Sequence, residues 1–349
     1  MTPYTEETEL PVDALPLPAW REALQVVKRE VRTFLPVWMY FAYACLLLNT
    51  ELTAFEPPRV DLAATVVFPL AVFVFFNVMR GLYAPDVTQR GRFIVLTTGV
   101  ALGLPLLNLS HFSPSPLSRD ALLACYEYSN FAWALLLGWH AWKRSPSLVA
   151  LFFGVGLVYG ALLENGGIVL GFFHEQNLVR TQVGPFPAPV ATMIGWCVVL
   201  YMAMFPVWRL RTWVPMLKRS ALLSAALVAG FATLLDLQID PLATALGCWV
   251  WHASLPGWFH GVPLANFVAW LCALFPLAYV LFRIQDLSGV RDGKAWPRPV
   301  LWRALAAVPA ALVLAALLFV GSTLVLEGPV GPSWELLSSF TSSLLAAWW

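Results

Sequence analysis

Long apolar stretches, separated by short polar segments, run along most of this chain. A helix needs about 20 apolar residues to cross the roughly 30 Å hydrocarbon core of a membrane. Nine stretches come close to that length, although the first and third are short and the seventh is overlong, with a predicted break at Pro241. The pattern predicts an all-α, polytopic integral membrane helical bundle of about nine transmembrane helices, at residues 33–49, 60–80, 93–109, 121–142, 147–172, 187–208, 221–251, 262–283 and 299–323.

Basic residues alternate between the flanks of these predicted helices. From the N-terminus through each loop to the C-terminus, Lys and Arg number 4, 1, 3, 1, 2, 1, 4, 0, 5 and 0, so alternate flanks hold 18 of the 21. Cytoplasmic loops carry the excess of Lys and Arg in membrane proteins. The N-terminus is therefore predicted in the cytoplasm and the C-terminus outside.

The two ends of the chain differ from the apolar region between them. Residues 1–32 begin as an acidic, proline-rich stretch without the basic start of a secretory signal, and we expect a flexible cytoplasmic segment there. Residues 33–323 form the predicted transmembrane domain. Residues 324–349 are too interrupted to span a membrane and predict an extracytoplasmic or interfacial tail.

Composition agrees with a membrane protein and excludes some functions. The chain is 59% hydrophobic and 12% charged, with a mean hydropathy of +0.71, which is more apolar surface than a soluble domain could bury. Its net charge of +1 gives no basic excess for nucleic acid, so no nucleic-acid partner is expected. The five cysteines form no C-x-x-C pair and have no zinc-ligand spacing.

Two carboxylates interrupt the seventh apolar stretch. Asp236 and Asp240 are four residues apart and share one face of a helix. Charge in hydrocarbon is costly, so a pair of acids there predicts a functional site. The alternative is a structural role, in which the acids bond neighbouring helices or cap the break expected at Pro241.

The predicted topology places further polar residues in the same half of the bilayer. Glu164 of the fifth helix and Glu127 of the fourth belong to the outer half, together with both aspartates. Neighbouring carboxyls in an apolar pocket can retain a proton and donate it, even to an alkene if aromatic faces shelter the cation. Candidate aromatic residues are Trp249, Trp251, Trp258, Tyr126, Tyr128 and Tyr159, although single tryptophans near a boundary are commonly interfacial.

Three further polar residues are candidates for substrate binding. Asn165 follows Glu164 in a glycine-rich stretch where a flat ligand could approach the backbone. Asn266 lies within the eighth helix and is a candidate hydrogen-bond partner for an acid or a water, and His260 precedes that helix. A metal centre is the other interpretation, because ligand types also include His174, Glu175 and His252; their spacing matches no zinc or di-iron motif, and no metal is expected.

The run D-L-Q-I-D-P-L-A-T-A-L-G-C-W-V-W (236–251), followed by H-G-V-P-L-A-N-F-V-A-W (260–270), resembles the membrane carotenoid hydratases of the gamma-carotene 1',2'-hydratase and bisanhydrobacterioruberin hydratase type. Glu164 with its spaced glycines and P-A-P-V-A-T-M-I-G-W (187–196) resemble an upstream block of that family. The resemblance covers about residues 150–285. The chain departs from the family at 171–177, which reads G-F-F-H-E-Q-N where tyrosines are expected.

The resemblance implies an enzyme that adds water across the terminal 1,2 double bond of an acyclic carotenoid end group, without a cofactor. It implies catalytic roles for Asp236, Asp240 and Glu164. It also implies a lipophilic carotenoid substrate, contact with membrane lipids and with other carotenoid-pathway membrane enzymes, and a place in the inner membrane of a prokaryotic cell. The residues assigned to substrate binding are Asn266, His260, Trp249, Trp251, Tyr159 and Asn165.

Two other functions fit parts of the pattern. A non-enzymatic carotenoid or lipid carrier would use the same polar cleft with glycine and aromatic walls. An intramembrane prenyltransferase also has a D-x-x-x-D motif, but it needs a second such motif for Mg²⁺ and basic residues for a diphosphate. The loop after the seventh helix has no Lys or Arg.

Overall fold

The computed structural model describes residues 118–327, apart from 176 and 213, together with scattered helical positions between 21 and 39 and between 335 and 342. The chain divides into two compact units, residues 1–35 with 62–105 and residues 36–61 with 106–349. The expected helices at 33–49, 60–80 and 93–109 lie almost entirely outside the described residues, as do most of the N-terminal segment and the tail. Residues 118–327 belong to the second unit.

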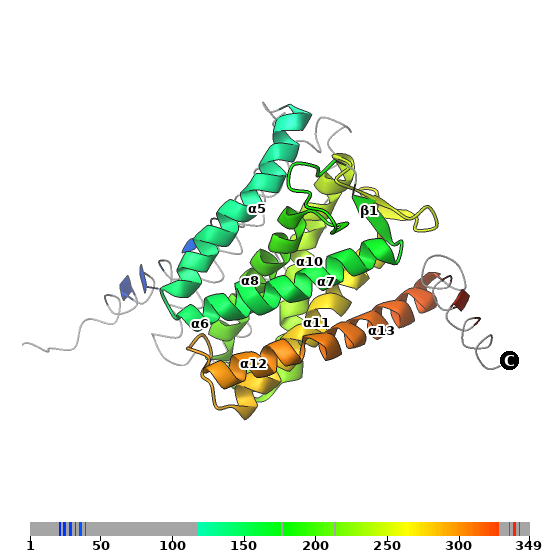
Figure 1. Cartoon of the computed structure of the whole chain (residues 1–349). Helices are drawn as coiled ribbons and strands as arrows, with labels where there is room; N and C mark the ends of the chain where they lie inside the picture. Colours follow the sequence, from blue (N-terminus) through cyan, green and yellow to red (C-terminus); the bar gives the residue numbers. More distant parts are fainter. Residues whose placement is uncertain are drawn as a thin grey trace, which may run out of the picture. The chain divides into compact units, whose positions relative to one another are not determined.

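The described part of this unit is mostly helical, as the apolar pattern predicts (Figure 1). Most helices begin and end within a few residues of the expected positions, but the seventh, expected to reach residue 251, ends at Ala245, and residues 249–251 form a strand. The helices are α5 (Arg119–Trp142), α6 (Pro146–Val149), the π-helical η3 (Ala150–Val155), α7 (Gly156–Val169), α8 (Val190–Arg211), α9 (Pro215–Arg219), α10 (Ala221–Ala245), α11 (Leu264–Leu287), α12 (Arg298–Ala306) and α13 (Val308–Glu327).

Within the described residues, five helical segments are long and apolar enough to cross a membrane. They correspond to the fifth to ninth stretches expected from the sequence. The fourth expected stretch forms helix α5 but is not among the five. The spans are Pro146–Val169, Val190–Arg211, Ala221–Ala245, Leu264–Leu287 and Arg298–Leu326.

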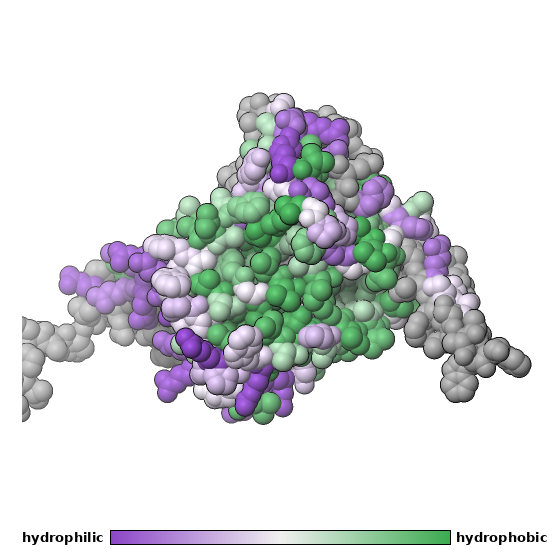
Figure 2. All heavy atoms as spheres, viewed as in Figure 1, coloured by the Kyte–Doolittle hydropathy of each residue, from purple (hydrophilic) through white to green (hydrophobic). Residues whose placement is uncertain are grey.

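Helix α8 is the most buried of the five spans. In its most apolar window 72% of the residues are buried, compared with 22% in Arg298–Leu326. Helix α8 packs against α5, α7 and α10, and α11 packs against both α10 and α13. Peripheral α13 leaves Val313 and Leu317 exposed, as expected of a helix that faces lipid. Figure 2 shows hydrophobic side chains across the middle of the viewed face, with hydrophilic residues gathered above and below.

Helix α10 continues through Pro241, so the predicted break at this residue is wrong. Its N-cap is Ser220, whose side chain accepts a hydrogen bond from the backbone of Leu223, and the helix ends only at Ala245. A proline inside a membrane helix removes one backbone donor, and packing against neighbouring helices can tolerate that loss. The continuous helix keeps Asp236 and Asp240 one turn apart.

Two short antiparallel sheets interrupt the helical architecture. Strand β1 (Phe173–Glu175) follows α7 and pairs with β2 (Trp249–Trp251), which follows α10, in the register Phe173↔Trp251 and Glu175↔Trp249. Strands β3 (Gly257–Phe259) and β4 (Val262–Pro263) form a hairpin before α11. Sheet β1–β2 thus fixes the loops at one end of α7, α8, α10 and α11.

Candidate active site

The two aspartates of α10 meet an amide from the first turn of α11. Asn266 donates a hydrogen bond from Nδ2 to Asp236 Oδ2 at 2.9 Å and another to Asp240 Oδ2. Asp236 and Asp240 are 0% and 2% exposed. The sequence predicted Asn266 as a partner for an acid, and the packing of α11 on α10 provides that contact.

The arrangement of the two carboxyls favours a shared proton. They lie close enough for a hydrogen bond between them, and such a bond forms only when one of them carries a hydrogen. Asp236 Oδ1 and Asp240 Oδ1 are buried and accept no hydrogen bond from the described protein groups. Two ionised carboxylates in contact away from water repel each other strongly. One proton held by the pair removes that repulsion and supplies a donor.

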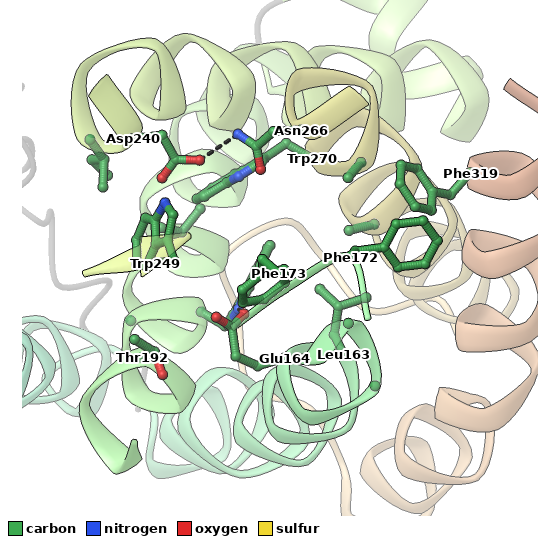
Figure 3. Close-up of a pocket in the computed structure, with 18 of the residues that line it drawn as sticks. Leu163, Glu164, Phe172, Phe173, Thr192, Asp240, Trp249, Asn266, Trp270 and Phe319 are labelled. Carbon is green, nitrogen blue, oxygen red and sulfur yellow. Dashed lines mark hydrogen bonds between the residues drawn. The ribbon is translucent and has the colours of Figure 1, made fainter. Parts of the chain in front are cut away.

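Asp240 and Asn266 form part of the wall of a cavity of about 470 Å³ (Figure 3). This volume lies within the range typical of small-molecule sites. The wall is built by α5, α7, α8, α10, α11 and α13, together with both strands of the first sheet. It is mainly apolar, and its aromatic side chains include Trp196, Trp249, Trp251, Trp270, Phe172, Phe173 and Phe319.

Glu164 lies on the other side of the same cavity, on α7 (Figure 3). Its Oε2 accepts a hydrogen bond of 2.6 Å from Nε1 of Trp196 on α8. The ring of Trp196 lies 4.7 Å, centroid to centroid, from that of Trp270, whose side chain lies beside Asp240. Two indoles thus connect the acids on opposite walls, and both acids face one ligand space.

Only some of the other residues that the sequence assigned to substrate binding line the cavity. Trp249 and Trp251 line the cavity, whereas Tyr159, Asn165 and His260 are not among its lining residues. Tyr159 donates its hydroxyl to the carbonyl of Ala273.

The polar contacts of Asn165 hold the backbone, and His260 lies at the surface. The side chain of Asn165 donates to Ala161 O at 2.7 Å and accepts from Ala188 N at 3.0 Å. His260 is exposed in the β3–β4 turn, with a backbone φ of 49°.

Glu127 is the fourth acid that the sequence placed in the outer half, and it anchors a loop. It is fully buried, and its Oε2 accepts hydrogen bonds from Thr181 N at 2.8 Å and Thr181 Oγ1 at 2.9 Å. Its Oε1 lies 3.3 Å from Arg180. These contacts hold the segment between β1 and α8 against α5.

The histidines considered as metal ligands do not converge on the acid pair. His252 pairs through Nδ1 with Ser254 Oγ at 2.7 Å. His174 lies in β1, opposite Val250 of β2. Among the residues that the structure describes, no three His, Cys, Asp or Glu side chains gather in a group that could hold a metal ion.

Several wall residues are not distinguished by their sequence pattern. Trp196 and Trp270 occur within apolar helices, where a tryptophan cannot be told from an ordinary packing residue. Phe173 and Phe319 are brought to the cavity by the β1–β2 pairing and by α13. Their only sequence signal is aromatic character, which is common throughout this chain.

A known protein family matches the part of the chain that contains this cavity. Residues 129–332 match the model of a family described as carotenoid biosynthesis protein. The match covers more than half of the chain and includes both aspartates, Glu164 and Asn266. No curated protein and no solved structure matches the chain.

Proposed function

The chain belongs to the carotenoid biosynthesis protein family, and from that premise we propose that it is a membrane hydratase. It adds water across the terminal 1,2 double bond of an acyclic carotenoid end group. The observation that carries this proposal is the buried Asp236–Asp240 pair at the wall of an aromatic cavity. A carboxyl that keeps its proton is the group that protonation of an alkene requires.

Asp240 is the proposed proton donor, because it lines the cavity whereas Asp236 is not among the lining residues. Its proton goes to carbon 2 of the double bond, and the positive charge forms at the tertiary carbon 1. A water oxygen then bonds to carbon 1, and the proton that this water loses returns to the acid pair. The sum is alkene plus water giving a tertiary alcohol, without redox change.

The surrounding groups support each part of this reaction. Asn266 holds both carboxyls in place through its amide hydrogens. Indole and phenyl faces in the wall stabilise a cation by their electron-rich surfaces. Glu164 on the opposite wall places a further carboxyl near the end group, where it can stabilise the cation or orient water.

Access from the membrane fits a lipophilic substrate. Leu162 of α7 and Leu170, which caps its C-terminus, line the cavity and are also 52% and 41% exposed, so the cavity reaches an apolar surface. A carotenoid end group can enter there while the rest of the chain stays in lipid. We place the enzyme in the inner membrane of a prokaryotic cell, beside other membrane enzymes of carotenoid synthesis.

The cavity lining argues against a prenyltransferase. None of the described residues that line the cavity is a Lys or Arg that could neutralise a diphosphate. A non-enzymatic carotenoid carrier would use the same apolar wall, but simple binding gives no reason for a buried pair of acids.

The test is the pigment profile of a host that makes an acyclic carotene, with and without this chain. The expected result is a new pigment heavier by one water, with a tertiary hydroxyl at the chain end. The control is the Asp240→Asn variant at equal membrane abundance, which should not form it. Unchanged pigments with the wild-type chain present in the membrane would overturn the hydratase assignment.

A further inference from the structure

The two tryptophans of β2 differ in whether their indole N–H groups are hydrogen-bonded. Both Trp249 and Trp251 line the cavity. Trp251 donates from Nε1 to Thr244 Oγ1 at 3.2 Å. Trp249 is 8% exposed, and its Nε1 is buried without a hydrogen-bond partner among the described protein groups. Buried donors in proteins are nearly always paired, so an unpaired one in a cavity wall indicates a ligand contact.

The position of Trp249 is fixed by its neighbours. Its strand pairs with β1, with Trp249 opposite Glu175. Its ring lies edge-on to those of Tyr126 and Trp251, at 6.0 and 6.5 Å between centroids. The indole therefore has little freedom to turn its N–H toward a protein acceptor.

The carboxyl of Asp240 carries an unpaired acceptor close to this unpaired donor. Figure 3 shows the nitrogen-bearing edge of Trp249 pointing toward Asp240. Asp240 Oδ1 is also buried and accepts no hydrogen bond from the described protein groups. A lone donor and a lone acceptor thus face the same part of the cavity.

We propose that Trp249 and Asp240 form a subsite for a hydroxyl oxygen, which accepts from Trp249 Nε1 and donates to Asp240 Oδ1. An indole only donates, so the ligand must accept from it. While the shared proton lies between the two aspartates, Asp240 Oδ1 is free to accept, and the same ligand must also donate to it. Water and an alcohol do both, whereas a ketone or ether would leave Asp240 Oδ1 unpaired. The inference rests on the proposed function for its choice of ligand, the tertiary alcohol of a hydrated end group or the water that forms it.

Occupancy of the subsite by the tertiary alcohol is tested by a binding assay. Purified full-length protein is incubated with an equal mixture of an acyclic carotene and its 1-hydroxy derivative, and the bound pigments are extracted and quantified. We expect the wild type to retain the alcohol preferentially and Trp249→Phe to lower that preference roughly fivefold to tenfold, the effect of one hydrogen bond. Trp251→Phe removes an N–H that already has a protein partner, and should change retention of both pigments by the same factor.

Occupancy of the subsite by water is tested by the rate of hydration. If it occupies the subsite while the alkene reacts, Trp249→Phe should lower kcat severalfold more than Trp251→Phe does, with a smaller effect on KM. Elution volume and melting temperature show whether both variants are folded. A larger effect of Trp249→Phe in either assay supports the subsite and identifies its occupant. Equal responses of the two variants in both assays overturn it.

The two proposals can fail separately. If the wild type forms no hydrated pigment in the host, the hydratase assignment fails, and the binding assay still tests the subsite. If hydration is observed and the two tryptophan variants respond alike, the subsite is wrong and the hydratase assignment stands.

Discussion

Trp196 on α8 donates its indole hydrogen to Glu164 on α7, with 2.6 Å between Nε1 and Oε2. The contact depends on how closely these helices approach each other. Gly160 lies one turn before Glu164 and faces Trp196, where a methyl group would come 2.4 Å from the Cβ of Trp196. Glycine at this position therefore sets the helix spacing at which Glu164 meets its partner.

Replacing Gly160 by Ala should push α7 and α8 apart. We expect a loss of about 1–3 kcal/mol of stability from overpacking, more than the roughly 0.5–1 kcal/mol that alanine gains in a helix. Hydration should fall as well, because Trp196 moves relative to Glu164. Melting temperature and hydration rate measure the two effects.

Gly166→Ala is the matched control for stability, because a methyl group there has nothing within 4 Å. It should be neutral or slightly stabilising. Equal melting temperatures for the two alanine variants would show that Gly160 does not control the α7–α8 spacing.

The sequence could predict those parts of the site that depend on local spacing. Asp236 and Asp240 share a helix face because they are four residues apart, and both lie in an apolar run where charge is costly. The same reasoning identified Glu164 and the amide of Asn266. The five spans in the described part of the chain follow from apolar length alone.

Features that depend on contacts between distant segments were not predictable in this way. The pairing of β1 with β2 joins loops more than 70 residues apart and brings Phe173 and Trp249 to the cavity. Tyr159 and Asn165 were expected to bind substrate, yet their polar groups bond backbone atoms that only the folded chain brings near. The break expected at Pro241 is absent because packing around α10 outweighs a local preference.

The stability of the folded chain should depend on pH through Asp292, which lies in the loop after α11. It accepts from Gln285 Nε2 at 2.6 Å and lies 3.4 Å from Nε of the buried Arg211. Burial raises the pKa of Asp292 above its ordinary value, and attraction to Arg211 offsets this only in part. The folded chain therefore holds this proton at a pH where the unfolded chain has released it. Stability should fall as pH rises above about 4, until Asp292 ionises in the folded state too.

Asp292→Asn should remove this contribution, so its melting temperature should decline less than that of the wild type as pH rises through that window. The measurement is melting temperature against pH in detergent. Asp286→Asn, which also changes a partner of Arg211, should keep most of the wild-type slope, because burial is the main cause of the raised pKa of Asp292 and the charge of Asp286 adds less. Parallel profiles for Asp292→Asn and the wild type would contradict the assignment.

Metal chelation should leave hydration unchanged. The proposed reaction needs an acid and aromatic shelter, which this chain's own residues supply, and a water as co-substrate. Purified protein would be assayed on an acyclic carotene before and after EDTA, and again after addition of Mg²⁺ or Zn²⁺. Loss of activity with recovery by one metal would contradict simple acid catalysis, and His174, His252 and His260 would be the first ligands to test.

The two aspartates of the pair should respond differently to removal of their acidic protons. Asparagine keeps the size and hydrogen-bonding capacity of aspartate but cannot protonate an alkene. Asp240→Asn should therefore lower the hydration rate roughly a hundredfold or more, while the carotene still binds. Asp236 is not among the cavity-lining residues, and Asp236→Asn should cause a smaller loss with a changed pH profile, because it alters how firmly Asp240 holds its proton.

The measurement is initial rate against pH for both variants, with carotene retention as the control for binding. If Asp240→Asn hydrates at the wild-type rate, Asp240 is not the donor. Glu164 would then be the acid to test, because it faces the same cavity from the opposite wall.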